Sequence, residues 1–97
     1  MSNLYHQQNQ QAWDLTARHK YAADVADDVA FLQAGQTNLL PIEVEMLQPI
    51  VPTCRRVIHL QCSHGLDALS LWQMGASEVI GVDISAEMLA LAQQKSE

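Results

Sequence analysis

The stretch that decides the fold is RVIHLQCSHGLDALSLWQMGASEVIGVD, residues 56–83. Short apolar runs rich in β-branched side chains open and close it, at residues 56–60 and 78–82, and each run predicts a buried strand. Between them, residues 61–65 form a tight connection, and residues 66–74 have the apolar spacing of a helix. A strand, a helix and a second strand in this order predict an α/β fold with two parallel strands.

Helical patterns flank this βαβ unit on both sides. Upstream, apolar spacing predicts two or three N-terminal helices, at residues 9–20, 22–33 and 41–47. Downstream, the hydroxyl of Ser85 can cap a further helix, which carries Lys95 near its end. The chain thus has helices first and the βαβ unit second.

Two prolines divide the chain. Pro49 and Pro52 break any helix, so we expect an N-terminal helical cap region at residues 1–52 and a βαβα unit at residues 53–97. Two strands are too few to bury both faces of a parallel sheet. We therefore expect an incomplete domain, either the N-terminal portion of a larger protein or a truncated product of one.

The composition narrows the class of protein. The net charge is 5 − 11 = −6, apolar residues make up 48% and charged residues 16%, which suits a packed domain rather than a disordered one. The few basic residues are scattered, so no nucleic-acid surface is indicated. No apolar run is long enough to predict a membrane span, and the N-terminus lacks a secretory signal. Two cysteines make no disulfide framework. Together these features predict a cytoplasmic protein.

The carboxyl ends of the two strands are the expected site. Ligands of such sheets bind there, where the backbone N–H groups of the following helix are unpaired. Asp83 ends the second strand, and its carboxylate can accept hydrogen bonds from both hydroxyls of a ribose. It follows Gly65 by 83 − 65 = 18 residues, near the ~20 expected between a nucleotide loop and its ribose acid. The spacing indicates an adenosine-type ligand.

Two common nucleotide motifs do not fit the connection at residues 61–65. The dinucleotide pattern G-x-G-x-x-G would place its glycines at Gln61, Ser63 and Leu66. A phosphate-binding loop would need Gly-Lys followed by Ser or Thr, which is absent from the sequence. The connection therefore matches neither motif.

Residues 57–93, VIHLQCSHGLDALSLWQMGASEVIGVDISAEMLALAQ, resemble the first two motifs of the class I methyltransferases that use S-adenosylmethionine. They are most similar to a branch whose first motif reads LHLQCGxGLDTLSLARxGA and continues into GVDxS. Residues 9–14 resemble the start of the N-terminal cap in that branch. The resemblance implies a Rossmann-like domain that transfers a methyl group from S-adenosyl-L-methionine. The acceptor is unknown, although the acidic balance slightly favours a small molecule, and the catalytic residues would lie beyond Glu97.

The resemblance also assigns roles to seven residues. It implies that five of them surround the methionine end of the cofactor, that the carboxylate of the sixth holds the ribose hydroxyls, and that the seventh packs against the adenine. In that order they are His59, Gln61, Cys62, Ser63 and Gly65, then Asp83, then Ile84. The wider family usually has an acid in place of His59, and glycines in place of Gln61 and Ser63.

Two other functions stay open at this point. One is a non-catalytic remnant or interaction module that associates with itself or a partner through an exposed sheet edge. The other is an NAD-dependent oxidoreductase, against which Leu66 argues because a glycine is needed there.

Several site residues also have simpler interpretations. Asp83 could cap the following helix without any ligand, and His59 could be a core histidine bonded to the backbone. Cys62 could be a nucleophile or merely a small residue on a tight loop. His59, Cys62 and His64 cluster in sequence, but three candidate ligands from one segment without a second pair do not predict a metal site.

The helical region offers two further candidates. Trp13 and Tyr21 could close over the cofactor, but ordinary helix packing is the simpler interpretation for Trp13. The acidic run from Asp24 to Asp28 is expected to be a solvated helix face.

Overall fold

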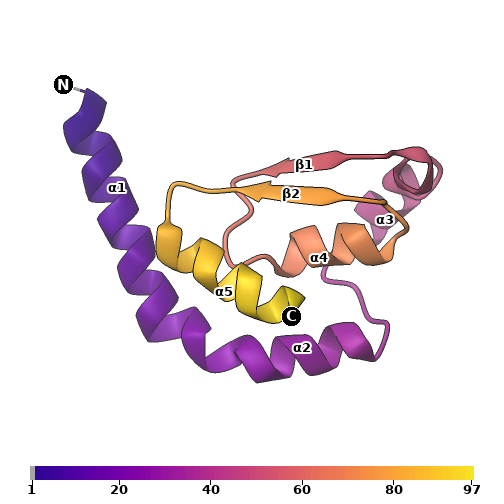
Figure 1. Cartoon of the computed structure of the whole chain (residues 1–97), viewed down its shortest axis with the longest axis horizontal. Helices are drawn as coiled ribbons and strands as arrows, with labels where there is room; N and C mark the ends of the chain where they lie inside the picture. The colour runs from indigo at the N-terminus through magenta and orange to yellow at the C-terminus, as the bar shows by residue number, and fades with distance from the viewer. Residues whose placement is uncertain (1) are drawn as a thin grey trace.

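The computed structural model describes residues 2–97 (Figure 1). The N-terminal half is helical, and the second half alternates strands with helices. In chain order the elements are α1 (Ser2–Thr16), the π-helical turn η1 (Ala17–Tyr21), the 3-10 turn η2 (Ala22–Asp24), α2 (Val25–Gln33), α3 (Pro41–Leu47), the 3-10 turn η3 (Val51–Thr53), β1 (Val57–Leu60), α4 (Leu66–Gln73), β2 (Val79–Val82) and α5 (Ala86–Ser96).

The βαβ unit is present as the sequence predicts. Strands β1 and β2 form a two-stranded parallel sheet in which Val57 pairs with Val79 and Leu60 pairs with Val82. Helix α4 connects the strands, and each strand starts one residue later than expected. The α/β class is therefore confirmed. The connection between β1 and α4 is called the 61–65 loop below.

The prediction that the strands are buried is wrong for one face of the sheet. Four apolar side chains that alternate along the strands are exposed: Ile58, Leu60, Ile80 and Val82. Figure 1 gives the reason, because α2, α4 and α5 all lie on the same side of the strands. Side chains that point toward these helices, such as Val57 and Val79, are half-buried. We call the four exposed residues the bare sheet face.

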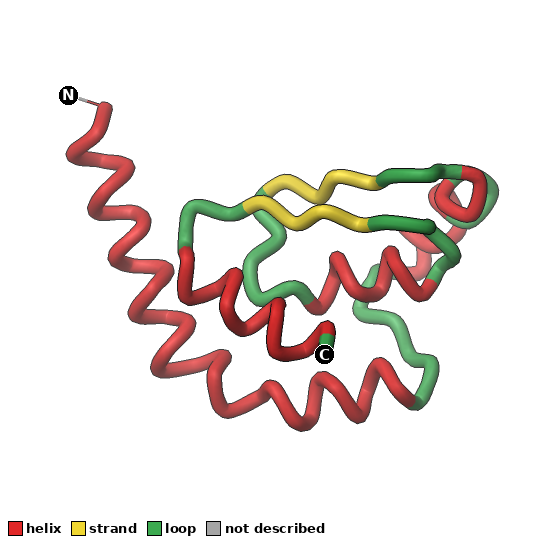
Figure 2. Tube along the Cα trace, viewed as in Figure 1, coloured by secondary structure: helices red, strands yellow, loops and turns green. Residues whose placement is uncertain are grey.

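Helix α1 begins at Ser2, earlier than the predicted start at residue 9. Residues 2–8 contain no Pro or Gly, so nothing in them stops a helix. Apolar periodicity did not indicate these first turns because Leu4 and Tyr5 are exposed. Figure 2 shows the helix continuing through η1 and η2 into α2 with a change of direction.

Two small clusters hold the elements together. The first contains Leu39, Val51, Leu71 and Ala76, and packs the segment around α3 and η3 against α4. The second contains Ala17, Met88 and Leu91, with Tyr21 and Val25 at its margin, and packs the N-terminal helices against α5. The second cluster therefore joins the two predicted regions, residues 1–52 and 53–97, beside the carboxyl end of β2. Among residues 2–97, no helix is both long and apolar enough to cross a membrane.

Candidate functional site

The 61–65 loop has an unusual backbone. Gln61, Ser63 and Gly65 have φ angles of 55°, 54° and 89°, so every second residue is left-handed. This conformation costs an L-residue roughly 1–2 kcal/mol, and only glycine adopts it freely. The loop therefore carries strain at Gln61 and Ser63, and strain of this kind is concentrated at functional sites.

Close packing against α5 explains why the loop ends in glycine. A Cβ atom on Gly65 would lie 2.4 Å from the Cβ atom of Ala92. The left-handed φ and this contact both require glycine at the start of α4. The loop is thereby pressed onto the middle of α5.

Cys62 fixes the loop to β2. Its backbone N–H donates to the carbonyl of Val82 at 3.0 Å, and its side chain is buried against Gly81. A Cβ atom on Gly81 would lie 2.7 Å from the Cys62 Sγ atom, so the thiol occupies the space that a larger residue would need. Burial, with the Asp83 carboxylate adding to it, raises the pKa of the Cys62 thiol. A raised pKa disfavours the thiolate, so the geometry suits a packing residue rather than a nucleophile.

Asp83 connects the loop to the start of α5. Its Oδ2 atom accepts the N–H of Ser63 at 2.9 Å, and its Oδ1 atom accepts the N–H of Ser85 at 2.9 Å. The helix cap itself is Ser85, as predicted, whose Oγ atom accepts the N–H of Met88 at 3.1 Å. A carboxylate offers about four acceptor positions, so Asp83 retains acceptor capacity after these two bonds. It is half-buried at the carboxyl end of β2.

Sequence reasoning missed a second carboxylate at this end of α5. The Oδ1 atom of Asp14 accepts the hydroxyl of Ser85 at 2.5 Å and lies 3.5 Å from the backbone nitrogen of Glu87. Negative charge is favourable at a helix N-terminus. No local signal marks Asp14, because α1 brings it there from 71 positions away in the sequence.

The remaining predicted site residues lie around this centre. Gln61 and Ile84 are exposed, and His59 is half-buried on β1. The Nδ1 atom of His59 is buried and has no hydrogen-bond partner among the described residues. The backbone bond expected of a core histidine is therefore absent at this atom. Trp13 is exposed, whereas Tyr21 packs beside the cluster of Ala17, Met88 and Leu91.

A large cleft lies elsewhere. It has a volume of about 780 Å³ and is lined by residues of α2, α4, α5 and β2, on the side of the sheet that the helices cover. Of the seven candidate residues, only Cys62 and Gly65 line it. The polar groups gathered around Asp83 are outside the cleft, so the candidate site is the strand-end constellation and not this cavity.

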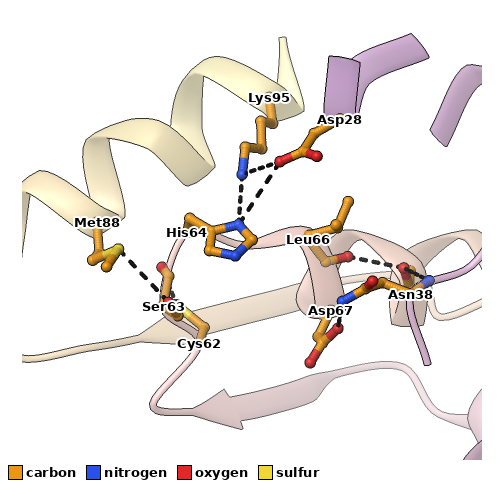
Figure 3. Close-up of polar contacts among 10 residues, drawn as sticks. Asp28, Asn38, Cys62, Ser63, His64, Leu66, Asp67, Met88 and Lys95 are labelled. Atoms are coloured by element: carbon orange, nitrogen blue, oxygen red, sulfur yellow. Dashed lines mark hydrogen bonds and ion pairs between the residues drawn. The ribbon is translucent and has the colours of Figure 1, made fainter. Parts of the chain in front are cut away.

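A cluster of charged groups holds the loop from the side of α2 and α5 (Figure 3). The Nζ atom of Lys95 donates to Asp28 Oδ2 at 2.8 Å and lies 2.6 Å from His64 Nδ1. The expectation of a solvated acidic face is therefore wrong for Asp28, which is half-buried because α2 packs on α5. Asp24 is exposed, as expected. We call Asp28, His64 and Lys95 the loop triad.

The described residues contain no group of three or more His, Cys, Asp or Glu side chains in a metal-binding arrangement. His59, Cys62 and His64, which are close in sequence, therefore do not converge on one point. Comparisons of the chain with known protein families, with curated proteins and with solved structures find no match.

Proposed function

We propose that the chain is the cofactor-binding part of a methyltransferase that uses S-adenosylmethionine, and that the adenosyl group binds at the carboxyl ends of β1 and β2. The observation that carries the proposal is the 61–65 loop, with left-handed residues at 61, 63 and 65 and its Ser63 N–H bonded to Asp83. The family that the sequence resembles usually has glycines at 61 and 63. Left-handed backbone is the reason a loop would need glycine at these positions.

The residues at the strand ends fit this cofactor. Asp83 retains acceptor capacity for ribose hydroxyls, and the exposed Ile84 beside it offers an apolar surface to a base. The Nδ1 atom of His59, which has no hydrogen-bond partner among the described residues, is a polar group that a ligand could satisfy. Because the cofactor has no pyrophosphate, the loop need not approach it as closely as in dinucleotide enzymes. The side chains of Gln61 and Ser63 are therefore compatible with binding.

Bound S-adenosylmethionine supplies a methyl group on a cationic sulfur, which a nucleophile takes by in-line displacement. Catalysis of such a transfer depends mainly on holding the two reactants in position. The contribution of this chain is to bind and orient: Asp83 fixes the loop and the start of α5 relative to each other. The proposal does not assign the acceptor of the methyl group, although a small molecule is slightly favoured.

Calorimetric titration of the folded chain tests the proposal. We expect saturable binding of S-adenosylhomocysteine, the demethylated cofactor, and no binding of NAD. Binding of NAD alone would replace the proposal with a dinucleotide enzyme. Binding of neither by a chain that is folded by circular dichroism would reject it.

Ile84→Ala locates the binding site. We expect this substitution to weaken the binding of S-adenosylhomocysteine about tenfold, because apolar contact with the ligand is lost. Ile80→Ala is the matched control, because Ile80 is similarly exposed, at 38% against 42% for Ile84, but belongs to the bare sheet face. Equal affinities for the two variants would exclude Ile84 from the site. Asp83→Ala should cost most of the affinity for S-adenosylhomocysteine, but it also removes the acceptor of the Ser63 N–H and is less specific.

A further inference from the structure

The loop triad connects the candidate cofactor loop to an ion pair between Lys95 and Asp28. Lys95 lies in the last turn of α5, and its side chain is 0% exposed. Its ammonium group bonds to Asp28 on α2 and to His64, which lies between Ser63 and Gly65 in the loop. Figure 3 shows the three side chains converging from these separate segments.

The donor and acceptor roles in the triad fix the charge of His64. An ammonium group has only donors, so the His64 Nδ1 atom, 2.6 Å away, must accept. The ring is therefore neutral, with its proton on Nε2. A second proton, on Nδ1, would make the ring cationic and set two cationic donors against each other at this distance. Asp28 Oδ2 lies 3.9 Å from Nδ1 and already accepts from Lys95.

The groups that face His64 come from every element packed against it. They are the Tyr21 ring of η1, tilted by 31° from the imidazole at 4.4 Å between centroids, Asp24 of η2, Asp28 of α2, Asp67 of α4 and Lys95 of α5. Burial and the Lys95 ammonium lower the pKa of His64 below its ordinary value of 6.5, and the three carboxylates only partly offset them. Asp67 is itself engaged, because its Oδ1 atom accepts the side-chain amide of Asn38 at 2.6 Å.

We propose that Lys95 and Asp28 are positioning residues for the 61–65 loop, which they hold through His64 only while its ring is neutral. Mild acidification then releases the loop from α5 and α2. The effect on the loop is independent of any ligand. Its consequence for cofactor binding rests on the proposed function.

The direction of the pH dependence follows from the proton balance. Because the pKa of His64 is lowered in the closed loop, the released form binds more protons below about pH 6.5. The contact is therefore fully stabilising above that pH. Its contribution is lost as the pH falls toward the lowered pKa.

Cys62 provides a reporter within the loop that needs no cofactor. Its thiol is 3% exposed, whereas Cys54 is half-buried outside the loop and serves as an internal reference. Both thiols are labelled with an aromatic disulfide reagent at about pH 7.5 and about pH 5.5, pH values on either side of an ordinary histidine pKa. Mass spectrometry gives the labelling rate of each thiol. The rate in the unfolded chain divided by the rate in the folded chain is the protection of that thiol. We expect the protection of Cys62 to fall about tenfold on acidification, the change expected when one hydrogen bond to a charged group is lost, while that of Cys54 stays constant. A pH-independent protection of Cys62 would overturn the proposal.

Two variants separate positioning from simple packing. His64→Gln keeps an acceptor for Lys95 but does not titrate, so its Cys62 protection should be high at both pH values. Lys95→Met keeps the length of the side chain and removes its charge, so protection should be reduced at both. Arg56→Gln, which breaks the exposed pair of Arg56 with Glu78 away from the loop, should behave as the natural chain does. A pH dependence that persists in His64→Gln would assign the effect to another group and reject the proposal.

Titration with S-adenosylhomocysteine over the same pH range distinguishes this proposal from the proposed function. If both hold, affinity falls on acidification in the natural chain and stays constant in His64→Gln. If the ligand binds at no pH while Cys62 protection still changes, the positioning triad stands and the cofactor assignment fails. If the ligand binds without pH dependence and Cys62 protection is constant, the triad fails and the cofactor assignment stands.

Discussion

At the scale of the residue, the 61–65 loop depends on backbone conformations that its sequence only partly favours. Gly65 suits its φ of 89°, whereas Gln61 and Ser63 adopt φ angles near 55° without that freedom. A sequence pattern that requires glycine at residues 61, 63 and 65 therefore matches only at Gly65. The strain at the other two is maintained by bonds from outside the loop, including the Ser63 N–H to Asp83.

Gly65→Ala tests how tightly the loop is pressed against α5. The new methyl group would meet Ala92 at 2.4 Å while the residue is held at a positive φ. We expect a loss of about 2–5 kcal/mol of unfolding free energy, the sum of left-handed strain and overpacking. Gly35→Ala is the matched control, since Gly35 has a φ of 78° and nothing within 4 Å of the new atom. It should cost only about 1–2 kcal/mol. Equal losses of unfolding free energy in the two variants, measured by urea unfolding, would show that the loop can move away from α5 at no cost.

At the scale of the element, the first turn of α5 is anchored to the N-terminal helices. Ser85 is fully buried, caps the N–H of Met88 and donates its hydroxyl to Asp14 of α1. Arg18 of η1 also pairs with Glu87 at 2.6 Å, on the exposed surface. The start of α5 is thereby fastened to the N-terminal helices, and this fastening also places Asp83 beside the loop.

Ser85→Ala measures this anchoring. The substitution removes a helix cap and leaves the carboxylate of Asp14 without its hydroxyl donor, so we expect a loss of about 2–3 kcal/mol. Ser96→Ala provides the matched control in the same helix, because Ser96 is exposed and its hydroxyl donates to the carbonyl of Gln93. It should change the free energy of unfolding by less than about 0.5 kcal/mol. Similar values for the two variants in urea unfolding would contradict the anchoring role of Ser85.

Local sequence patterns predicted most of the helices and strands, but they did not predict the contacts between them. The periodicity and the prolines predicted α3 with its observed bounds, both strands within one residue, and the cap at Ser85. They did not predict the burial of Lys95, because an exposed lysine near a helix end is the ordinary case. Only the packing of α2 on α5 brings Asp28 to it. The loop triad thus arises from tertiary structure that no short window of sequence contains.

At the scale of the whole molecule, the helices that pack on the sheet all lie on one side of it (Figure 1). The apolar runs of β1 and β2 have the pattern of strands that are buried on both faces, although two strands are too few to bury both. Within residues 2–97 only one face is covered, so half of that apolar pattern forms the bare sheet face. The two small clusters of the core lie on the covered side or at its margins. The sequence therefore predicts the positions of both strands correctly, but its apolar pattern matches the observed burial on only one face of the sheet.

Paired leucine truncations test this one-sided architecture. Leu71 is 8% exposed in the first cluster, and Leu71→Ala should cost about 2–5 kcal/mol of unfolding free energy. Leu60 is 69% exposed on the bare sheet face, and Leu60→Ala should cost less than about 1 kcal/mol. If both substitutions cost the same in urea unfolding, the bare sheet face is covered in solution. A cost for Leu60→Ala that grows with protein concentration would then identify a second copy of the chain as the cover, because only association makes stability depend on concentration.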